Sequence, residues 1–227
     1  MIKVILWDID GTLLDFLAAE RAAIRRCFEI FGLGTCTDAM LEDYSAINVK
    51  HWQMLERNER TKPEILVGRF QEFFSKYGLD TSVVSAFNDE YQIRLGDTIV
   101  FRPGAMETLQ ALRGRVVQCA VTNGTRIAQE RKLELSGLNQ ILDYIFISED
   151  VGVEKPNLAF FDRVFAEIGT YAPHEVLIVG DSLTSDIRGG NNAGILTCWF
   201  NPEGKENGLG VHVDHEITRI DQVLGLL

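Results

Sequence analysis

Two carboxylates stand two residues apart near the start of the sequence, in the stretch Asp8-Ile9-Asp10-Gly11-Thr12. They directly follow an apolar run that reads as a buried strand. Two carboxylates this close repel each other, and one of them would keep a proton unless a cation lies nearby. A divalent ion with oxygen ligands removes that conflict. The pair therefore predicts a metal-assisted reaction, with an Asp-rich surface turn as the alternative.

A third carboxylate, Asp181, follows a second apolar run, and Asp186 lies further along the same stretch. Magnesium prefers octahedral oxygen coordination with few carboxylates and retained waters. Asp8 and Asp181, together with the backbone carbonyl of Asp10, would form such a ligand set. We expect Asp186 to lie outside it and to orient a water or a nearby lysine. A helix N-cap is the alternative role for Asp181.

Two further segments offer groups that bind phosphate oxygens. Thr122, Asn123 and Gly124 bring a hydroxyl, an amide and a glycine N–H together after an apolar run. Lys155 precedes a proline, which favours an extended backbone at the lysine and a helix start after it. Each segment alone resembles an ordinary turn or a solvated lysine. With the carboxylates, they supply a nucleophile, metal ligands, a hydroxyl and a cation, which is the set that phosphoryl transfer requires.

The elements that would position these residues are short apolar runs rich in Val and Ile, separated by helical patterns. The runs cover residues 4–7, 116–121, 144–147, 176–179 and 196–200. Continuous apolar strands that alternate with helices predict a parallel sheet buried on both faces. Ligands of such sheets bind beyond the carboxyl ends of the strands, so the four polar segments are expected to meet at that edge.

Residues 16–97 interrupt this alternation with several helical patterns and no convincing strand. One pattern places Leu66, Phe70, Phe73, Phe74 and Tyr77 on a single helix face. The sequence therefore predicts an α/β protein with a Rossmann-like, doubly wound parallel sheet. Its core comprises residues 1–15 and 98–227, and an all-helical cap of residues 16–97 is inserted after the first strand.

The order of the motifs, DxDGT, Thr-Asn-Gly, Lys-Pro and GDxxxxD, resembles that of the haloacid dehalogenase-like hydrolase superfamily. The stretches RKLELSGL, SEDVGVEKP and GGNNAG extend the resemblance over essentially the whole chain. The resemblance implies a Mg²⁺-dependent phosphomonoester hydrolase that works through an aspartyl-phosphate. It makes Asp8 the nucleophile and Asp10 the general acid and base. It assigns phosphoryl binding to Thr122 and Lys155, and metal binding to Asp8, Asp10 and Asp181.

A finer resemblance concerns the cap, where Asn48, Trp52 and Arg69 stand in stretches similar to bacterial pyrimidine 5′-nucleotidases. It implies a nucleoside 5′-monophosphate as substrate, with these three side chains contacting the leaving group when the cap closes. The alternative role of Trp52 is packing between cap helices. Sugar phosphates and phosphoglycolate are alternative substrates, and a phosphomutase is an alternative activity. A haloacid dehalogenase and a non-catalytic phospholigand-binding regulator remain as rivals. Asp10 and Asp181 argue against the dehalogenase, whose ester intermediate needs neither metal nor acid.

The amino-acid composition restricts the classes of partner and substrate that the chain is expected to bind. The 227 residues are 46% hydrophobic and 24% charged, with a formal net charge of -11. Such an acidic chain lacks the surplus of Lys and Arg that binding to a nucleic-acid polymer requires. No stretch is long and apolar enough to span a bilayer. The four cysteines form no CxxC pair, which suits a reducing compartment. We therefore expect a cytoplasmic monomer or homodimer that acts on a small phosphate ester.

Overall fold

The computed structural model describes residues 1–227, which form two compact units. The first, here called the core unit, comprises Met1–Asp15 and Ile99–Leu227. The second, called the cap unit, comprises Phe16–Thr98 and is inserted between those two segments. The chain thus leaves the core unit soon after its first strand and returns to it before the second.

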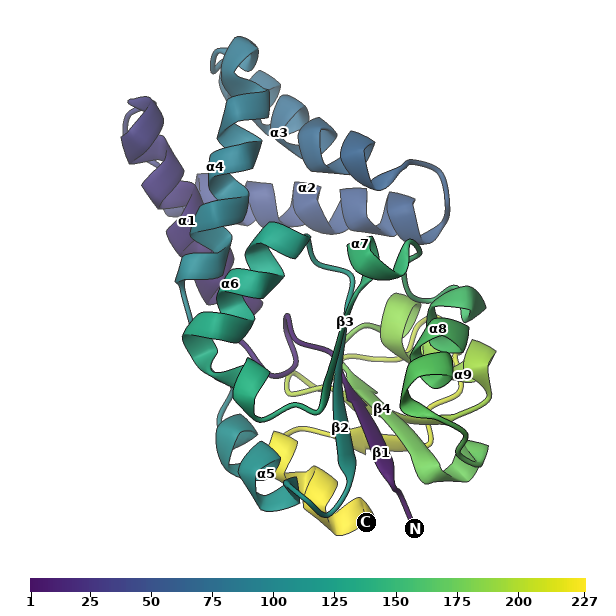
Figure 1. Ribbon diagram of the computed structural model, residues 1–227. Coiled ribbons are helices and arrows are strands. Elements are labelled where there is room, and N and C mark those ends of the chain that lie inside the picture. Colours follow the sequence, from purple (N-terminus) through teal and green to yellow (C-terminus); the bar gives the residue numbers. More distant parts are fainter. The chain divides into compact units, whose positions relative to one another are not determined.

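The core unit is built on one six-stranded sheet in which every neighbouring pair of strands is parallel. The strand order is β3-β2-β1-β4-β5-β6, with β1 inside the sheet (Figure 1). The strands are β1 (Val4–Trp7), β2 (Val117–Thr122), β3 (Tyr144–Ile147), β4 (Val176–Gly180), β5 (Leu196–Phe200) and β6 (His215–Ile217). This arrangement confirms the predicted doubly wound α/β fold.

Helices cover both faces of this sheet because alternate side chains of each strand are apolar. Ile5 and Trp7 pack in one buried cluster, whereas Val4 and Leu6 pack in the other. The first cluster includes residues of α5 (Ala105–Leu112), α6 (Arg126–Ser136) and the short helix η5 (Ile220–Leu226). The second includes residues of α8 (Leu158–Ile168), with α9 (Arg188–Ala193) beside it. The remaining short helices are η2 (Leu138–Gln140), α7 (Ser148–Val151), η3 (Pro173–Glu175) and η4 (Leu183–Ile187).

The edge strand β6 is the one strand that the sequence did not predict. It has three residues, His215–Ile217, and only Ile217 is buried. Its neighbours hold it by polar contacts, since the Asn201 amide donates to Glu216 over 2.7 Å. So short and polar a segment shows no apolar run or alternation, and its pairing with β5 is a tertiary effect.

The cap unit consists of α1 (Phe16–Phe31), α2 (Asp38–Glu56), α3 (Lys62–Tyr77), η1 (Thr81–Val83) and α4 (Val84–Asp97). Its interior is aromatic: Tyr44 and Phe70 stack with ring centroids 5.0 Å apart, and Phe87 meets Phe70 edge-on, also at 5.0 Å. The predicted aromatic face of α3 is present, although Ile65 is fully buried and Leu66 only partly so. The cap unit therefore has a hydrophobic core of its own.

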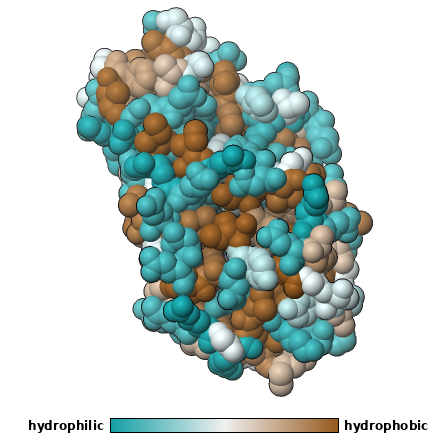
Figure 2. Space-filling model, in the orientation of Figure 1, coloured by the Kyte–Doolittle hydropathy of each residue, from teal (hydrophilic) through white to brown (hydrophobic).

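The helices are too short or too polar for any of them to cross a membrane. On the face of the molecule drawn in Figure 2, hydrophilic residues interrupt the apolar ones. Most large hydrophobic side chains are buried, and those that are exposed, such as Leu17, Ile127 and Leu209, lie far apart in the sequence.

Candidate active site

The polar segments predicted from the sequence do meet at the carboxyl edge of the sheet. Asp8 directly follows β1, and its N–H extends the strand ladder by donating to the Val179 carbonyl over 3.0 Å. Lys155 arrives from the connection between β3 and α8 and reaches Asp8 through the interior. Residues more than a hundred positions apart in the sequence thereby share one cluster of contacts.

Lys155 is the cation at the centre of this cluster, and it is 1% exposed. Its Nζ donates to Asp8 Oδ1 over 3.0 Å, to Asp186 Oδ1 over 2.6 Å and to the Val121 carbonyl over 2.6 Å. These are three acceptors for three ammonium protons. Burial alone would lower the pKa of Lys155, but the charges of Asp186 and Asp8 outweigh it and raise that pKa. Lys155 therefore favours its charged form beside Asp8.

Thr12 connects the two ends of the carboxylate cluster, a role that the sequence analysis missed. Its hydroxyl donates to Asp8 Oδ2 over 3.0 Å and accepts the N–H of Asp181 over 3.1 Å. The side chain is completely buried. Gly11 beside it has a φ of +99°, and a Cβ at this position would lie 2.5 Å from Asp181 Oδ2. The Gly-Thr pair of DxDGT thus lets the first loop approach Asp181, which explains both residue types.

Three carboxylates gather here: oxygens of Asp8, Asp181 and Asp186 lie within 4.8 Å of one another. Burial raises the pKa of Asp8 well above its usual range, because Lys155 offsets only part of the cost. Asp181 has an exposed part, yet burial of its carboxyl group and then the charge of Asp186 raise its pKa to about 7. Both shifts favour the protonated carboxyl groups, and a further cation at the cluster would favour the ionised ones.

The charges of the site fit a divalent cation. Asp8, Asp181 and Asp186 are joined by Asp10, whose carboxylate is the fourth negative charge, while the cations that face them are Lys155 and Lys132. Two negative charges are therefore left over when all groups are ionised, which matches one Mg²⁺ ion. The Asp10 side chain turns toward Lys132 of α6, so a ligand role for Asp10 would fall to its backbone carbonyl.

Asp186 lies on η4, a single π-helical turn, and this feature brings it to the cluster. Besides the contact with Lys155, it accepts the N–H of Ser182 over 3.1 Å. It is 1% exposed. Asp186 thus contacts the lysine, while one of its oxygens also lies within 4.8 Å of oxygens of Asp8 and Asp181. Its expected place outside the ligand set of a metal stays a prediction.

The Thr122-Asn123-Gly124 segment forms the loop after β2. Thr122 is buried, and its hydroxyl accepts the Gly124 N–H over 3.1 Å. The amide of Asn123 contacts the Lys155 backbone twice, donating to its carbonyl over 2.8 Å and accepting its N–H over 2.9 Å. Asn123 thus ties the two loops together, a positioning role that the sequence did not predict.

The three cap residues singled out in the sequence have different surroundings within the cap unit. Arg69 donates to the Asn48 side-chain oxygen over 2.8 Å, and the Asn48 amide donates to Glu20 over 2.8 Å. Asn48 and Arg69 are each 2% exposed, and burial raises the pKa of Glu20. Trp52 is partly buried. Asn48 and Arg69 therefore belong to a polar network that links α1, α2 and α3.

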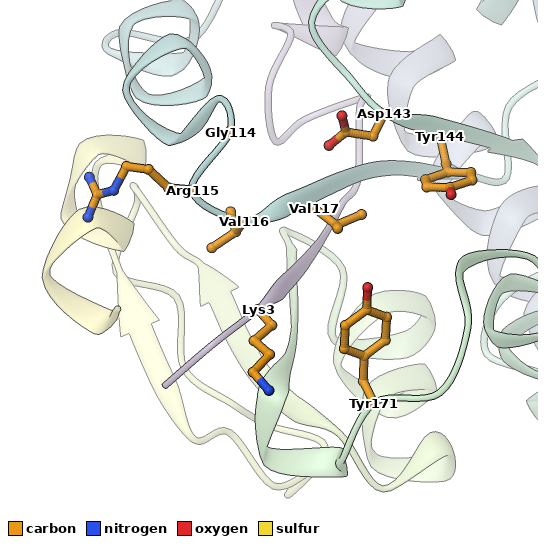
Figure 3. A pocket seen from close by; sticks show the side chains of 8 residues that line it. All are labelled: Lys3, Gly114, Arg115, Val116, Val117, Asp143, Tyr144 and Tyr171. Carbon is orange, nitrogen blue, oxygen red and sulfur yellow. The ribbon is translucent and has the colours of Figure 1, made fainter.

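A hollow of about 670 Å³ opens at the opposite edge of the sheet, where β1, β2 and β3 begin (Figure 3). Lys3 on its wall pairs with Glu175 over 2.5 Å, and Asp143 accepts the Gln118 N–H over 2.8 Å. Its lining residues are Lys3, Gly114, Arg115, Val116, Val117, Asp143, Tyr144 and Tyr171. With a single acid and no carboxylate cluster, this hollow lacks the groups for metal-assisted catalysis. The carboxyl edge remains the candidate active site.

Comparison with known proteins agrees with this geometry. The family model of the haloacid dehalogenase-like hydrolases matches residues 2–194. The chain is similar to the pyrimidine 5′-nucleotidase PynA of Streptococcus pneumoniae, with 34% identity over 99% of this chain and 94% of that protein. A glyceraldehyde 3-phosphate phosphatase of Methanopyrus kandleri is 32% identical over 87% of this chain and 83% of its own length.

Among solved structures, the HAD-hydrolase YfnB of Bacillus subtilis, bound to magnesium, superimposes with a TM-score of 0.92 at 33% identity. The match covers 100% of this chain and 98% of that one. Family model, sequence relatives and structure agree over nearly the whole length. The chain therefore belongs to the haloacid dehalogenase-like hydrolase family.

Proposed function

We propose that this protein is a magnesium-dependent phosphomonoester hydrolase in which Asp8 is transiently phosphorylated. The observation that carries the proposal is the buried cluster in which Lys155 Nζ lies 3.0 Å from Asp8 and 2.6 Å from Asp186, with Asp181 beside them. It combines a carboxylate nucleophile with a fixed cation and further carboxylates for a divalent ion. The relatives named as phosphatases and nucleotidases support the same reaction class.

The reaction runs in two steps. A carboxylate oxygen of Asp8 attacks phosphorus and the ester P–O bond breaks, while Asp10 gives its proton to the leaving oxygen. Asp10 then takes a proton from water, the water oxygen attacks phosphorus, and the bond to Asp8 breaks to release phosphate. The positive charge of Lys155 and the Thr122 hydroxyl stabilise the phosphoryl oxygens during both steps. Magnesium, when bound, supplies charge stabilisation and orientation for those oxygens.

The proposed substrate is a nucleoside 5′-monophosphate. Support comes from the 34% identity with the pyrimidine 5′-nucleotidase PynA over nearly the full length of both chains. A contact of Asn48, Trp52 and Arg69 with the leaving nucleoside stays a prediction. A sugar phosphate is the second candidate, because the Methanopyrus kandleri phosphatase is 32% identical.

A phosphate-release screen tests the reaction and the substrate together. The panel contains pyrimidine and purine 5′-monophosphates, sugar phosphates, phosphoglycolate and p-nitrophenyl phosphate, each with Mg²⁺ and with EDTA. We expect release that needs Mg²⁺ and is fastest with pyrimidine nucleotides. Asp8→Asn, checked by mass spectrometry for deamidation back to Asp, should be inactive. Wild-type rates in that variant, or in EDTA, would refute the proposal, and a fastest sugar phosphate would refute only the nucleotide assignment.

A further inference from the structure

Two side chains of α6 donate hydrogen bonds to the Asp10 carboxylate. Gln129 Nε2 donates to Asp10 Oδ2 over 2.6 Å, and Lys132 Nζ donates to Asp10 Oδ1 over 2.5 Å. Each oxygen of the carboxylate thus has its own donor. The two donors stand three residues apart, so they project from the same face of the helix. Two bonds from one rigid element fix both the position and the rotation of the carboxylate.

Both donors are deeply buried. Burying an amide and a charged lysine costs free energy, and their hydrogen bonds to Asp10 offset that cost. Gln129 and Lys132 are each 1% exposed, whereas the Asp10 side chain is 18% exposed. A buried lysine is tolerated only when its charge is paired. The Gln129 Oε1 atom is buried without a hydrogen-bond partner, although its Nε2 reaches Asp10. The bond to Asp10 is therefore what determines the orientation of this amide.

Gly124 makes room for the contact. A Cβ at this position would lie 2.1 Å from Gln129 Nε2, closer than any real side chain approaches. Any other residue at position 124 would push the amide away from Asp10. This contact with α6 gives a further reason for the glycine of the Thr-Asn-Gly segment, and its predicted contact with phosphate stays a prediction.

Lys132 and Lys155, the buried lysines of the core unit, contact different carboxylates. Lys155 contacts Asp8 and Asp186, whereas the ion pair of Lys132 is with Asp10. Lys155 thus belongs to the nucleophile and Lys132 to the group that would transfer protons. From this division we propose that Gln129 and Lys132 are positioning residues that aim Asp10 for proton transfer to the leaving oxygen. The inference rests on the proposed phosphatase reaction and names residues that act on its acid.

A leaving-group comparison tests the inference. p-Nitrophenolate leaves with little help from an acid, whereas an alkoxide such as that of a nucleoside needs a proton. A misplaced Asp10 should therefore slow the hydrolysis of alkyl phosphate esters more than that of p-nitrophenyl phosphate. The measured quantity is the ratio of kcat/KM for p-nitrophenyl phosphate to kcat/KM for uridine 5′-monophosphate, or for the best alkyl ester of the screen. This constant reports the step in which the ester bond breaks.

We expect Lys132→Met to raise that ratio on the order of tenfold or more, since a well-placed general acid contributes roughly 10²- to 10⁴-fold. Gln129→Leu should raise it less, and Lys132→Arg should restore part of the wild-type ratio. Glu130→Gln, an exposed charge change on the same helix, is the matched control and should leave the ratio unchanged.

If Lys132→Met lowers kcat/KM equally for both esters, Lys132 has only a structural role and the inference is overturned. Unchanged kcat/KM values for both esters would overturn it as well. If Lys132→Met does not fold, the ratio in Gln129→Leu and Lys132→Arg decides, and a wild-type ratio in both overturns it. A wild-type protein without phosphatase activity would instead refute the proposed function, so the two failures are distinguishable.

Discussion

At the scale of single residues, the site is governed by the surplus of carboxylates over lysines. Lys155 and Lys132 are both buried and paired with carboxylates of the site. Burial is the main cause of the raised pKa values of Asp8 and Asp181, and the neighbouring carboxylates raise them further. Magnesium and protons should therefore compete for the same carboxylates, which makes metal binding depend on pH.

This competition predicts a pH-dependent stabilisation by magnesium. Burial raises the pKa of Asp181 from 3.8 to about 7, so the folded metal-free protein keeps this proton up to neutral pH while the unfolded chain releases it earlier. The free energy of unfolding of the metal-free protein consequently falls as pH rises through that window. Magnesium removes this penalty, so its increase in Tm should be larger at about pH 8 than at about pH 6.

Thermal unfolding with Mg²⁺ and with EDTA at both pH values checks this expectation. Asp181→Asn is the control, because it has no proton to exchange and should lose most of the magnesium effect at either pH. A magnesium-induced increase in Tm that is equal at both pH values, or larger in acid, would contradict the account.

Thr12 offers a second test at this scale. Thr12→Val keeps the shape but removes the hydroxyl that joins Asp8 to the Asp181 N–H. Because the partly buried Asp181 N–H loses its acceptor, the free energy of unfolding should fall by about 1 kcal/mol, as denaturant titration would measure. Thr12→Ser keeps the hydroxyl and should lose clearly less. Equal losses in the two variants would show that the methyl packing matters, not the hydrogen bonds.

At the scale of elements, the loop after β2 and the segment before α8 are joined through the Asn123 amide and the Lys155 backbone. Asn123→Ala should therefore displace Lys155 and lower kcat/KM by roughly tenfold to hundredfold, since small misplacements of catalytic groups have effects of that size. Steady-state kinetics on the best substrate of the screen measure this loss.

Asn157→Ala is a matched control from the same connection. Asn157 is exposed and caps α8 by accepting the Ala159 N–H over 3.0 Å, so its loss should cost about 1 kcal/mol of stability and leave kcat/KM unchanged. If Asn123→Ala also kept the wild-type kcat/KM, the amide would be a stabilising link without influence on Lys155.

The elements also show how far the sequence could be interpreted. The interior strands, such as β1 and β4, were predictable because burial on both faces makes them continuous apolar runs. The position of Asp8, Lys155 and Asp181 followed, since parallel strands end at one edge. The hydrogen bonds from α6 to Asp10 could not be predicted. A Gln and a Lys three residues apart on a helix have the pattern of solvated surface residues, and the sequence does not show that the loop with Asp10 packs against them.

At the scale of the whole molecule, the chain is two units with separate interiors and a net charge of -11. The aromatic cluster of the cap unit, around Phe70, and the sheet of the core unit each bury their own apolar side chains. The sequence predicted a helical insertion from the loss of strand patterns after residue 15, because helix and strand patterns differ in period.

The net negative charge predicts that the protein binds nucleic-acid polymers poorly. A polyanion is repelled by the net negative charge of the protein, whereas a single phosphate ester needs only the local magnesium site. Poly(U) should therefore not inhibit the hydrolysis of uridine 5′-monophosphate when the two are present at equal nucleotide concentration. Inhibition assays at low and moderate salt measure this, and competitive inhibition that weakens with salt would reveal a basic binding surface and contradict the prediction.

The central claim is that Asp8 carries the phosphoryl group, and trapping that group tests it most directly. The wild-type protein is mixed with substrate and Mg²⁺, quenched in acid during turnover, digested and mapped by mass spectrometry. The account predicts phosphate on the peptide that contains Asp8, absent when EDTA replaces Mg²⁺ and absent in Asp8→Asn. Phosphate on a different residue, or turnover in Asp8→Asn at the wild-type rate, would contradict it.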